Sequence, residues 1–187
     1  PFGILPVSQD EEALCVEKVR MIGDPVAAVA AIDEETAEAA LEDIVVEYEI
    51  LPSILSIEEG LKELEESELA DAQIHKYADS GNIHKQVALE FGDTESGFAE
   101  ADFLREELFY YEGNTHLPME QHSAVGQHGA DGRVTLWSST QTPHYVHRAL
   151  AKVLEMPASQ IRVIATPVGG GFGGKTDPFQ HEIVVCK

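Results

Sequence analysis

The chain has 187 residues, a formal net charge of −22 at pH 7 and 43% hydrophobic residues. This hydrophobic content can form a buried core in one or two domains, whereas the negative charge argues against nucleic acid or an anionic membrane as a partner. No run reaches the roughly 18 apolar residues of a membrane span, and the first residues lack the basic start of a signal peptide.

The acidic residues are concentrated in the first part of the chain. Residues 1–112 hold 29 of the 34 acidic residues, and residues 113–187 hold five acids against six bases. We therefore expect an anionic ligand or a buried interface in the second part, with an ordinary core as the alternative. Cys15 and Cys186 lack C-x-x-C spacing, which predicts neither a disulfide framework nor a zinc site and favours a reducing cytoplasm. Because the chain does not begin with Met, we expect it to be a piece of a longer protein.

The first segment is predicted to be a compact α/β unit. Residues 26–32 form a short apolar run that suits a strand buried on both faces. Asp33 is placed to cap a following helix, and residues 45–51 are predicted to form a second strand. Such short connections favour a right-handed crossover unit. The helix between the strands has one apolar face, formed by Ala37, Ala40, Leu41 and Ile44.

An acidic stretch follows this unit. Ser56 can cap a short helix that continues to Leu64. Residues 65–81 are acidic and weakly patterned, so we expect an exposed connection there.

Strand signals open the second segment at residues 105–111 and recur at residues 123–127. A turn at residues 129–132 then leads into an apolar run at residues 134–138. The last two strands are therefore predicted to form a hairpin.

A helix is predicted after the hairpin, with Thr142 at the N-cap, Pro143 at the first helical position and a stop at Met156. His144 and His147 fall on its polar face, and we expect both to face solvent. The opposite face is apolar and consists of Val146, Ala149, Leu150, Val153 and Leu154.

Three histidines, His116, His122 and His128, recur every six residues. This spacing would place them on one face of a strand, where a zinc triad is conceivable. No carboxylate or cysteine accompanies them at ligand spacing, so the zinc site is kept only as an alternative.

The chain is organised around a glycine-rich loop. Residues 161–166 predict a buried strand, which leads into residues 167–176, where five of the six positions from Gly169 to Gly174 are glycine. Glycine allows positive φ angles and lets backbone N–H groups approach a bulky or anionic ligand. Phe172, the one large side chain, is expected to plug a core or to line a pocket.

Two other interpretations of this loop stay open. Residues 169–176 match the phosphate-binding pattern G-x-x-x-x-G-K-[ST]. A phosphate loop opens directly into a helix, whereas here Pro178 and a strand-like end at residues 183–185 follow. The loop could also be a purely structural turn.

Three motifs in this order carry a family resemblance: residues 119–122 (MEQH), residues 139–143 (STQTP) and the glycine loop. The chain resembles the molybdenum-binding subunit of the xanthine dehydrogenase and aldehyde oxidase family. The resemblance implies a mixed α/β (α+β) fold, with part of an α/β hammerhead domain followed by the first part of the molybdopterin-binding domain. We accordingly expect the hammerhead at residues 1–64, an acidic linker at 65–81 and the start of the cofactor domain at 82–187.

Within this family, residues 110–122 and 177–182 look most like the large subunit of 4-hydroxybenzoyl-CoA reductases. Xanthine-oxidising members carry an acidic residue directly after the loop lysine, where it contacts the purine. Thr176 occupies that position here. The resemblance therefore makes Thr176 a predicted substrate contact and argues against a purine substrate.

The resemblance also implies the cofactor and the residues that surround it. The cofactor would be molybdenum-molybdopterin, in its cytosine dinucleotide form, with the metal held by the pterin. Gln141, Gly171, Phe172 and Gly173 match the cofactor-binding positions, and Gln141 and Phe172 would lie in the molybdenum environment without being metal ligands. A fixed set of neutral donors suits such an anionic metal-oxo group. Iron–sulfur clusters and FAD would lie on partner subunits, in a multimer of heterotrimers.

The implied reaction is the reductive dehydroxylation of 4-hydroxybenzoyl-CoA to benzoyl-CoA. One alternative is the oxidative hydroxylation of an aldehyde or an aromatic N-heterocycle, in which water is the oxygen source. An alternative of another class is a non-catalytic interaction module, in which the glycine loop is only structural.

The catalytic base of the family is a glutamate in a C-terminal region beyond these 187 residues. We therefore predict that the isolated chain neither retains the cofactor nor turns over substrate. Molybdenum-dependent activity from the isolated chain would contradict this prediction.

Overall fold

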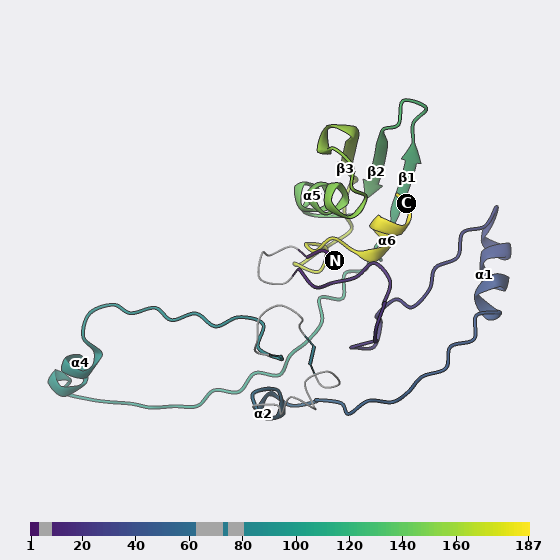
Figure 1. Cartoon of the computed structure of the whole chain (residues 1–187). Coiled ribbons are helices and arrows are strands. Elements are labelled where there is room, and N and C mark those ends of the chain that lie inside the picture. The colour runs from purple at the N-terminus through teal and green to yellow at the C-terminus, as the bar shows by residue number, and fades with distance from the viewer. Residues whose placement is uncertain (4–8, 63–72, 75–80) are drawn as a thin grey trace. The chain divides into compact units, whose positions relative to one another are not determined.

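The computed structural model describes residues 1–3, 9–62, 73–74 and 81–187 (Figure 1). These residues form two compact units, one of residues 1–84 with 116–187 and one of residues 85–115. The elements are α1 (Glu34–Glu42), α2 (Ile57–Gly60), α4 (Thr94–Glu100), β1 (Ala124–His128), β2 (Val134–Ser138), α5 (Pro143–Val153), the 3-10 helix η1 (Ala158–Gln160), β3 (Ile161–Ala165) and α6 (Gln180–Val184).

The centre of the first unit is a three-stranded sheet in the order β1-β2-β3. β1 and β2 form the predicted antiparallel hairpin, with Gly126 opposite Leu136. β3 pairs with β2 in parallel, and Ser138 lies opposite Ala165 at the end of both strands. A parallel pair needs a crossover, and here α5 supplies it. The strands predicted at the hairpin and at residues 161–166 are therefore confirmed.

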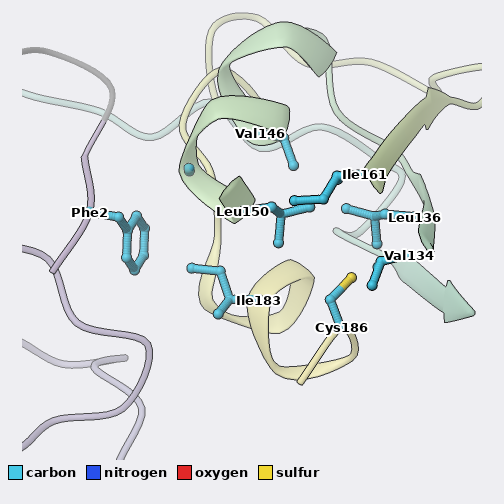
Figure 2. Packing of buried hydrophobic residues seen from close by; sticks show 9 residues of the cluster. Phe2, Val134, Leu136, Val146, Leu150, Ile161, Ile183 and Cys186 are labelled. Carbon is cyan, nitrogen blue, oxygen red and sulfur yellow. The ribbon is translucent and has the colours of Figure 1, made fainter. Parts of the chain in front are cut away.

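The hydrophobic core lies where α5 and α6 pack against this sheet (Figure 2). α5 has the predicted apolar face, because Val146, Ala149 and Leu150 are buried. The full buried cluster consists of Phe2, Val134, Leu136, Val146, Ala149, Leu150, Ile161, Ile183 and Cys186.

Three predicted strands do not form. The described residues 26–32, 45–51 and 105–111 have no strand, and most of their side chains are exposed. An isolated strand leaves its backbone N–H and C=O groups unpaired, so an apolar run becomes a strand only beside another strand. No neighbouring strand lies along these runs among the described residues, and the predicted crossover unit is absent with them.

The helix between the first two of these runs does form. The side chain of Asp33 accepts a hydrogen bond from the N–H of Thr36 at 2.8 Å, as predicted for an N-cap. The predicted buried face is wrong, because α1 has no buried residue. The helix thus depends on its cap and on the acidic residues of its first turn rather than on packing.

One later prediction needs correction in part, and another falls mostly outside the described residues. Ser56 caps α2 as expected, but that helix ends at Gly60, and Leu64, its predicted end, lies outside the described residues. The predicted linker at residues 65–81 lies outside the described residues apart from residues 73–74 and 81.

The strand-like end at residues 183–185 is in fact helical, since α6 spans Gln180–Val184. A run of three apolar residues is too short to distinguish the helical period of 3.6 residues from the strand period of two. The carboxyl of Glu182 stabilises the start of the helix by accepting a hydrogen bond from the N–H of Phe179.

The polar face of α5 was predicted correctly at His144, which is exposed. His147 differs, because its Nε2 lies 3.0 Å from the carbonyl oxygen of Ala158 and 3.1 Å from that of Ile161. It therefore joins α5 to the start of β3. No helix in the described part of the chain is both long and apolar enough to cross a membrane.

The hairpin offers a matched test of this core, because Val134 is fully buried and Val125 is 63% exposed. We expect Val134→Ala to lower the opening free energy of β2 by about 2 kcal/mol, because the substitution removes buried apolar surface and leaves a cavity. Val125→Ala should change it by less than about 0.5 kcal/mol. Amide hydrogen exchange of the β2 and β3 residues measures both effects, and equal effects would contradict the assigned register.

Candidate functional site

The glycine loop follows β3 and has an unusual backbone. Three of its residues have positive φ angles: Gly170 (102°), Phe172 (52°) and Gly173 (91°). Glycine adopts such angles without strain, whereas a phenylalanine rarely does. The side chain of Phe172 is 77% exposed, so it does not plug the core. It projects from the loop and is available to line a pocket.

Gln141 lies inside the curve of this loop. Its Oε1 accepts hydrogen bonds from the N–H of Gly173 at 3.2 Å and from the N–H of Lys175 at 3.3 Å. A Cβ atom at Gly171 would lie 2.5 Å from the same oxygen, a distance that real Cβ atoms do not reach. Position 171 therefore requires glycine as long as the Gln141 amide stays in place.

The segment that carries Gln141 is itself bonded to the end of the loop. The N–H of Gln141 donates to the carbonyl oxygen of Lys175 at 3.0 Å, and the hydroxyl of Thr140 donates to the same oxygen at 3.3 Å. The hydroxyl of Thr142 donates to the carbonyl oxygen of Thr176, and it does not cap α5. Residues 140–142 and 173–176 are thus held together.

The structure brings four of the five sequence-predicted site residues into one place: Gln141, Gly171, Phe172 and Gly173 belong to or contact the loop. Thr176 follows directly and is half-buried. Among the residues that the structure describes, no acceptor faces the backbone N–H groups of residues 170–172. These are neutral donors on a surface that has almost no side chains, and such a surface suits an anionic ligand of considerable size.

Lys175 does not behave as the lysine of a phosphate loop. Its side chain is 1% exposed, and its Nζ lies 2.8 Å from Oε2 of Glu120. The following helix, α6, begins only at Gln180. The loop therefore lacks both the free lysine and the adjoining helix that phosphate binding requires.

Glu120 is a site residue that sequence reasoning missed as an individual position. Hydrogen bonds from the Lys175 ammonium and from the N–H of Gly169 lower the pKa of its carboxyl. The one sequence feature that could have pointed to Glu120 is the scarcity of acidic residues around it, since residues 113–187 contain only five.

The three regularly spaced histidines do not meet. His116 lies against Gly174, where a Cβ would come within 2.9 Å of its Cγ. Nε2 of His122 lies 2.9 Å from the carbonyl oxygen of Gly174, and Nε2 of His128 lies 3.1 Å from that of Cys186. No group of three His, Cys, Asp or Glu side chains in the described ranges could hold a metal ion. The zinc alternative therefore has no geometric support, and two of the histidines contact the glycine loop instead.

An aromatic group adjoins the end of the loop. The ring of His122 lies 4.2 Å from that of Phe179 and 6.0 Å from that of His181, measured between centroids. Burial lowers the pKa of His181, and the neighbouring His122 lowers it further.

Beside this group, Glu182 is 1% exposed, and its carboxyl accepts hydrogen bonds from the hydroxyl of Ser138 and the N–H of Phe179. Burial raises the pKa of Glu182, which these two bonds oppose. This carboxyl joins α6 to the end of β2.

A second carboxyl with a raised pKa lies near the residues that follow the loop. Burial raises the pKa of Glu11 to about 7, and the charges of Asp177, Asp10 and Asp24 add to the effect. The backbone of Glu11 pairs with that of Phe2, through N–H to oxygen distances of 2.8 and 3.1 Å. Phe2 in turn belongs to the buried core.

Comparison with protein families gives two matches. Residues 74–187 match the molybdopterin cofactor-binding domain. Residues 2–52 match the α/β hammerhead domain of aldehyde oxidase and xanthine dehydrogenase. Together the two matches cover most of the chain.

Similar proteins of known name were found by sequence and by structure. The chain is 36% identical over 176 residues to the nicotinate dehydrogenase large molybdopterin subunit of Eubacterium barkeri, covering 94% of this chain and 39% of that protein. It is 38% identical over 171 residues to the xanthine dehydrogenase molybdenum-binding subunit of Escherichia coli O157:H7, covering 91% of this chain and 22% of that protein. The aldehyde oxidoreductase of Desulfovibrio gigas matches with a TM-score of 0.79 and 31% identity, over 97% of this chain and 20% of that one. The chain thus spans well under half the length of each.

The raised pKa of Glu11 predicts a pH dependence with a definite sign. The folded state holds a proton on Glu11 more tightly than an exposed glutamate does, since the pKa rises from 4.5 to about 7. The stability of the Phe2–Glu11 pairing should therefore be greatest below pH 4.5 and should fall as the pH rises to about 7. Amide exchange of these two residues, corrected for intrinsic pH dependence, measures it. Glu11→Gln should abolish the fall and Asp177→Asn should reduce it, whereas an unchanged slope in Glu11→Gln would contradict the assignment.

Proposed function

Because the chain belongs to the xanthine dehydrogenase and aldehyde oxidase family, as part of a molybdenum-binding subunit, we propose that the full-length protein is a molybdenum-dependent oxidoreductase. Its reaction would be the oxidative hydroxylation of an aldehyde or an aromatic N-heterocycle, with water as the oxygen source. The names of the relatives support this choice, since nicotinate and xanthine are aromatic N-heterocycles. The match to an aldehyde oxidoreductase supports the aldehyde alternative.

The observation that carries the proposal is the meeting of Gln141 with the glycine loop. The Gln141 oxygen accepts from two loop amides, and the N–H groups of residues 170–172 have no acceptor among the described residues. The space that a Cβ would fill at Gly171 is already occupied by Gln141. This set of fixed neutral donors without side-chain bulk fits molybdopterin, an anionic cofactor whose dithiolene holds the metal.

In this proposal, Gln141, Gly171, Phe172 and Gly173 hold the cofactor, with Gln141 and Phe172 in the molybdenum environment. The bound cofactor supplies two-electron redox chemistry. The chain's own contribution is to orient amide donors toward the anionic group and to exclude water with the exposed ring of Phe172. Each preorganised donor of this kind is typically worth roughly 3 kcal/mol in a transition state. Thr176 is proposed to contact the substrate.

The remaining assignments belong to the same proposal. The cofactor would be the cytosine dinucleotide form, and iron–sulfur clusters and FAD would lie on partner subunits of a multimer of heterotrimers. Both sequence relatives are named as subunits of larger enzymes, which supports the expectation of partner subunits.

The domain boundaries and the cellular location of the protein are also part of the proposal. We propose a hammerhead at residues 1–64, a linker at 65–81 and a cofactor domain at 82–187. The family matches at 2–52 and 74–187 leave a gap at 53–73, which overlaps this linker in part. A cytoplasmic location is supported by Cys15 and Cys186, which are both free.

Reductive dehydroxylation of 4-hydroxybenzoyl-CoA is kept as the second candidate. The sequence favours it through residues 110–122 and 177–182, which resemble the large subunit of 4-hydroxybenzoyl-CoA reductases. Thr176, which stands where xanthine-oxidising members carry an acid, argues only against a purine. The relatives described above are named for nicotinate, xanthine and aldehyde, so hydroxylation is the better supported reaction.

The deciding experiment is metal and pterin analysis of the full-length protein from its native host, followed by turnover assays. The substrates would be nicotinate, xanthine, an aromatic aldehyde and, with a low-potential electron donor, 4-hydroxybenzoyl-CoA. Molybdenum with hydroxylation of any of the first three supports the proposal. Molybdenum with benzoyl-CoA as the product selects the second candidate. Absence of molybdenum, together with salt-sensitive binding to a partner that is independent of Gln141, would favour the interaction module.

A substitution at Gly171 tests whether the contact between Gln141 and the loop is needed for cofactor binding. Gly171→Ala should displace the Gln141 amide, because the added Cβ would lie 2.5 Å from its oxygen, and we expect bound molybdenum per chain to fall at least about tenfold. Gly113→Ala is the matched control, since nothing lies within 4 Å of a Cβ there. Equal molybdenum contents in the two variants would remove Gly171 and Gln141 from the cofactor site.

A further inference from the structure

One carboxylate holds both ends of the glycine loop. Oε2 of Glu120 accepts a hydrogen bond from the N–H of Gly169, the first glycine of the loop. The same oxygen lies 2.8 Å from Nζ of Lys175, the residue that ends the loop. Glu120 belongs to neither strand nor helix, so this contact also fastens the segment before β1 to the loop after β3.

The lysine cannot exchange this partner for water. Its side chain is 1% exposed, while that of Glu120 is 32% exposed. A buried ammonium group is strongly disfavoured without a paired acceptor, so Lys175 stays in place only where Glu120 supplies the negative charge. Glu120 remains ionised, because the bonds from Lys175 and Gly169 lower the pKa of its carboxyl.

The backbone of Lys175 passes this restraint to Gln141. The N–H of Lys175 donates to Oε1 of Gln141, and its carbonyl oxygen accepts from the N–H of Gln141. A lysine anchored by its side chain therefore fixes the position of the glutamine through two backbone contacts. Movement of the Lys175 side chain would shift both the Gln141 amide and the loop amides.

We infer that Glu120 and Lys175 are positioning residues, whose ion pair holds the loop 169–175 and the Gln141 amide in the arrangement that the ligand needs. This inference rests on the proposed function for the nature of the ligand, but the restraint on the loop is a property of the chain itself. Neither residue is assigned a contact with the substrate.

The test uses the full-length protein with two variants and one control. Glu120→Gln keeps the shape but leaves the Lys175 ammonium buried without a counter-charge. The double variant Glu120→Gln with Lys175→Met contains no unpaired buried charge, so it is expected to fold even if the single variant does not. Asp131→Asn is the control, because it weakens the exposed pair of Asp131 with Arg133, in which the side chains are 62% and 70% exposed.

The first readout is amide hydrogen exchange. We expect exchange at the hydrogen-bonded loop amides of Gly173 and Gly174 to become at least about tenfold faster in both variants than in the control, with β2 and β3 unchanged. Wild-type exchange at the loop in the double variant would overturn the inference. Uniformly faster exchange over the whole chain in the double variant would overturn it too, because that result indicates general destabilisation.

The second readout separates positioning from a structural role. For turnover of the best substrate, kcat per bound molybdenum should fall at least about tenfold while KM changes less than about twofold, since neither residue meets the substrate. An unchanged kcat per bound molybdenum would show that the pair only supports folding and would overturn the inference. If the wild-type protein holds no molybdenum, the proposed function fails, and the exchange experiment still decides on the ion pair.

Discussion

The parallel pairing of β2 with β3 sets the relative position of Gln141 and the glycine loop. Ser138 and Ala165 lie opposite each other at the ends of these strands, so the two segments that follow leave the sheet at the same edge. One segment carries Gln141 and the other becomes the glycine loop. Parallel strands need a crossover, and α5 provides it while packing its apolar face on the core. The functional segments are therefore adjacent because the core is built in this way.

Side chains and internal turns, rather than a helix or strand, hold the glycine loop in shape. With positive φ angles at Gly170, Phe172 and Gly173, its amides meet acceptors on side chains or within the loop, as Gly174 does with the carbonyl oxygen of Gly171 at 2.7 Å. Gln141 and Glu120 supply acceptors at defined points, while three amides at residues 170–172 are left without any acceptor in the described part of the chain. The result is a set of donors with little side-chain bulk apart from Phe172, which suits an anionic ligand.

Two carboxylates of the second part, those of Glu120 and Glu182, join distant parts of the fold. Glu120 neutralises a buried lysine, and Glu182 bonds Ser138 and starts α6. Both lie in the nearly neutral part of the chain. The acidic first part instead contributes exposed carboxylates such as Asp33 and Asp93, which accept hydrogen bonds from the first turns of α1 and α4. Asp33 and Asp93 therefore serve as local helix caps, whereas Glu120 and Glu182 join elements that are distant in the sequence.

The local structure of several elements could be predicted from the sequence alone. The caps at Asp33 and Ser56, the hairpin, the apolar face of α5 and the glycine loop all follow from patterns within a few residues. The family resemblance also rested on such patterns and was confirmed by the two family matches.

What the sequence could not supply was the partner of each group. The apolar runs at 26–32, 45–51 and 105–111 form no strand, because strand formation depends on a neighbouring backbone. In the same way, nothing near Lys175 in the sequence identifies Glu120, which stands 55 residues earlier. The sequence by itself determined the caps, the turn and the glycine-rich backbone. Only the tertiary structure decided which distant acceptor each buried donor meets, because that pairing depends on packing across the fold.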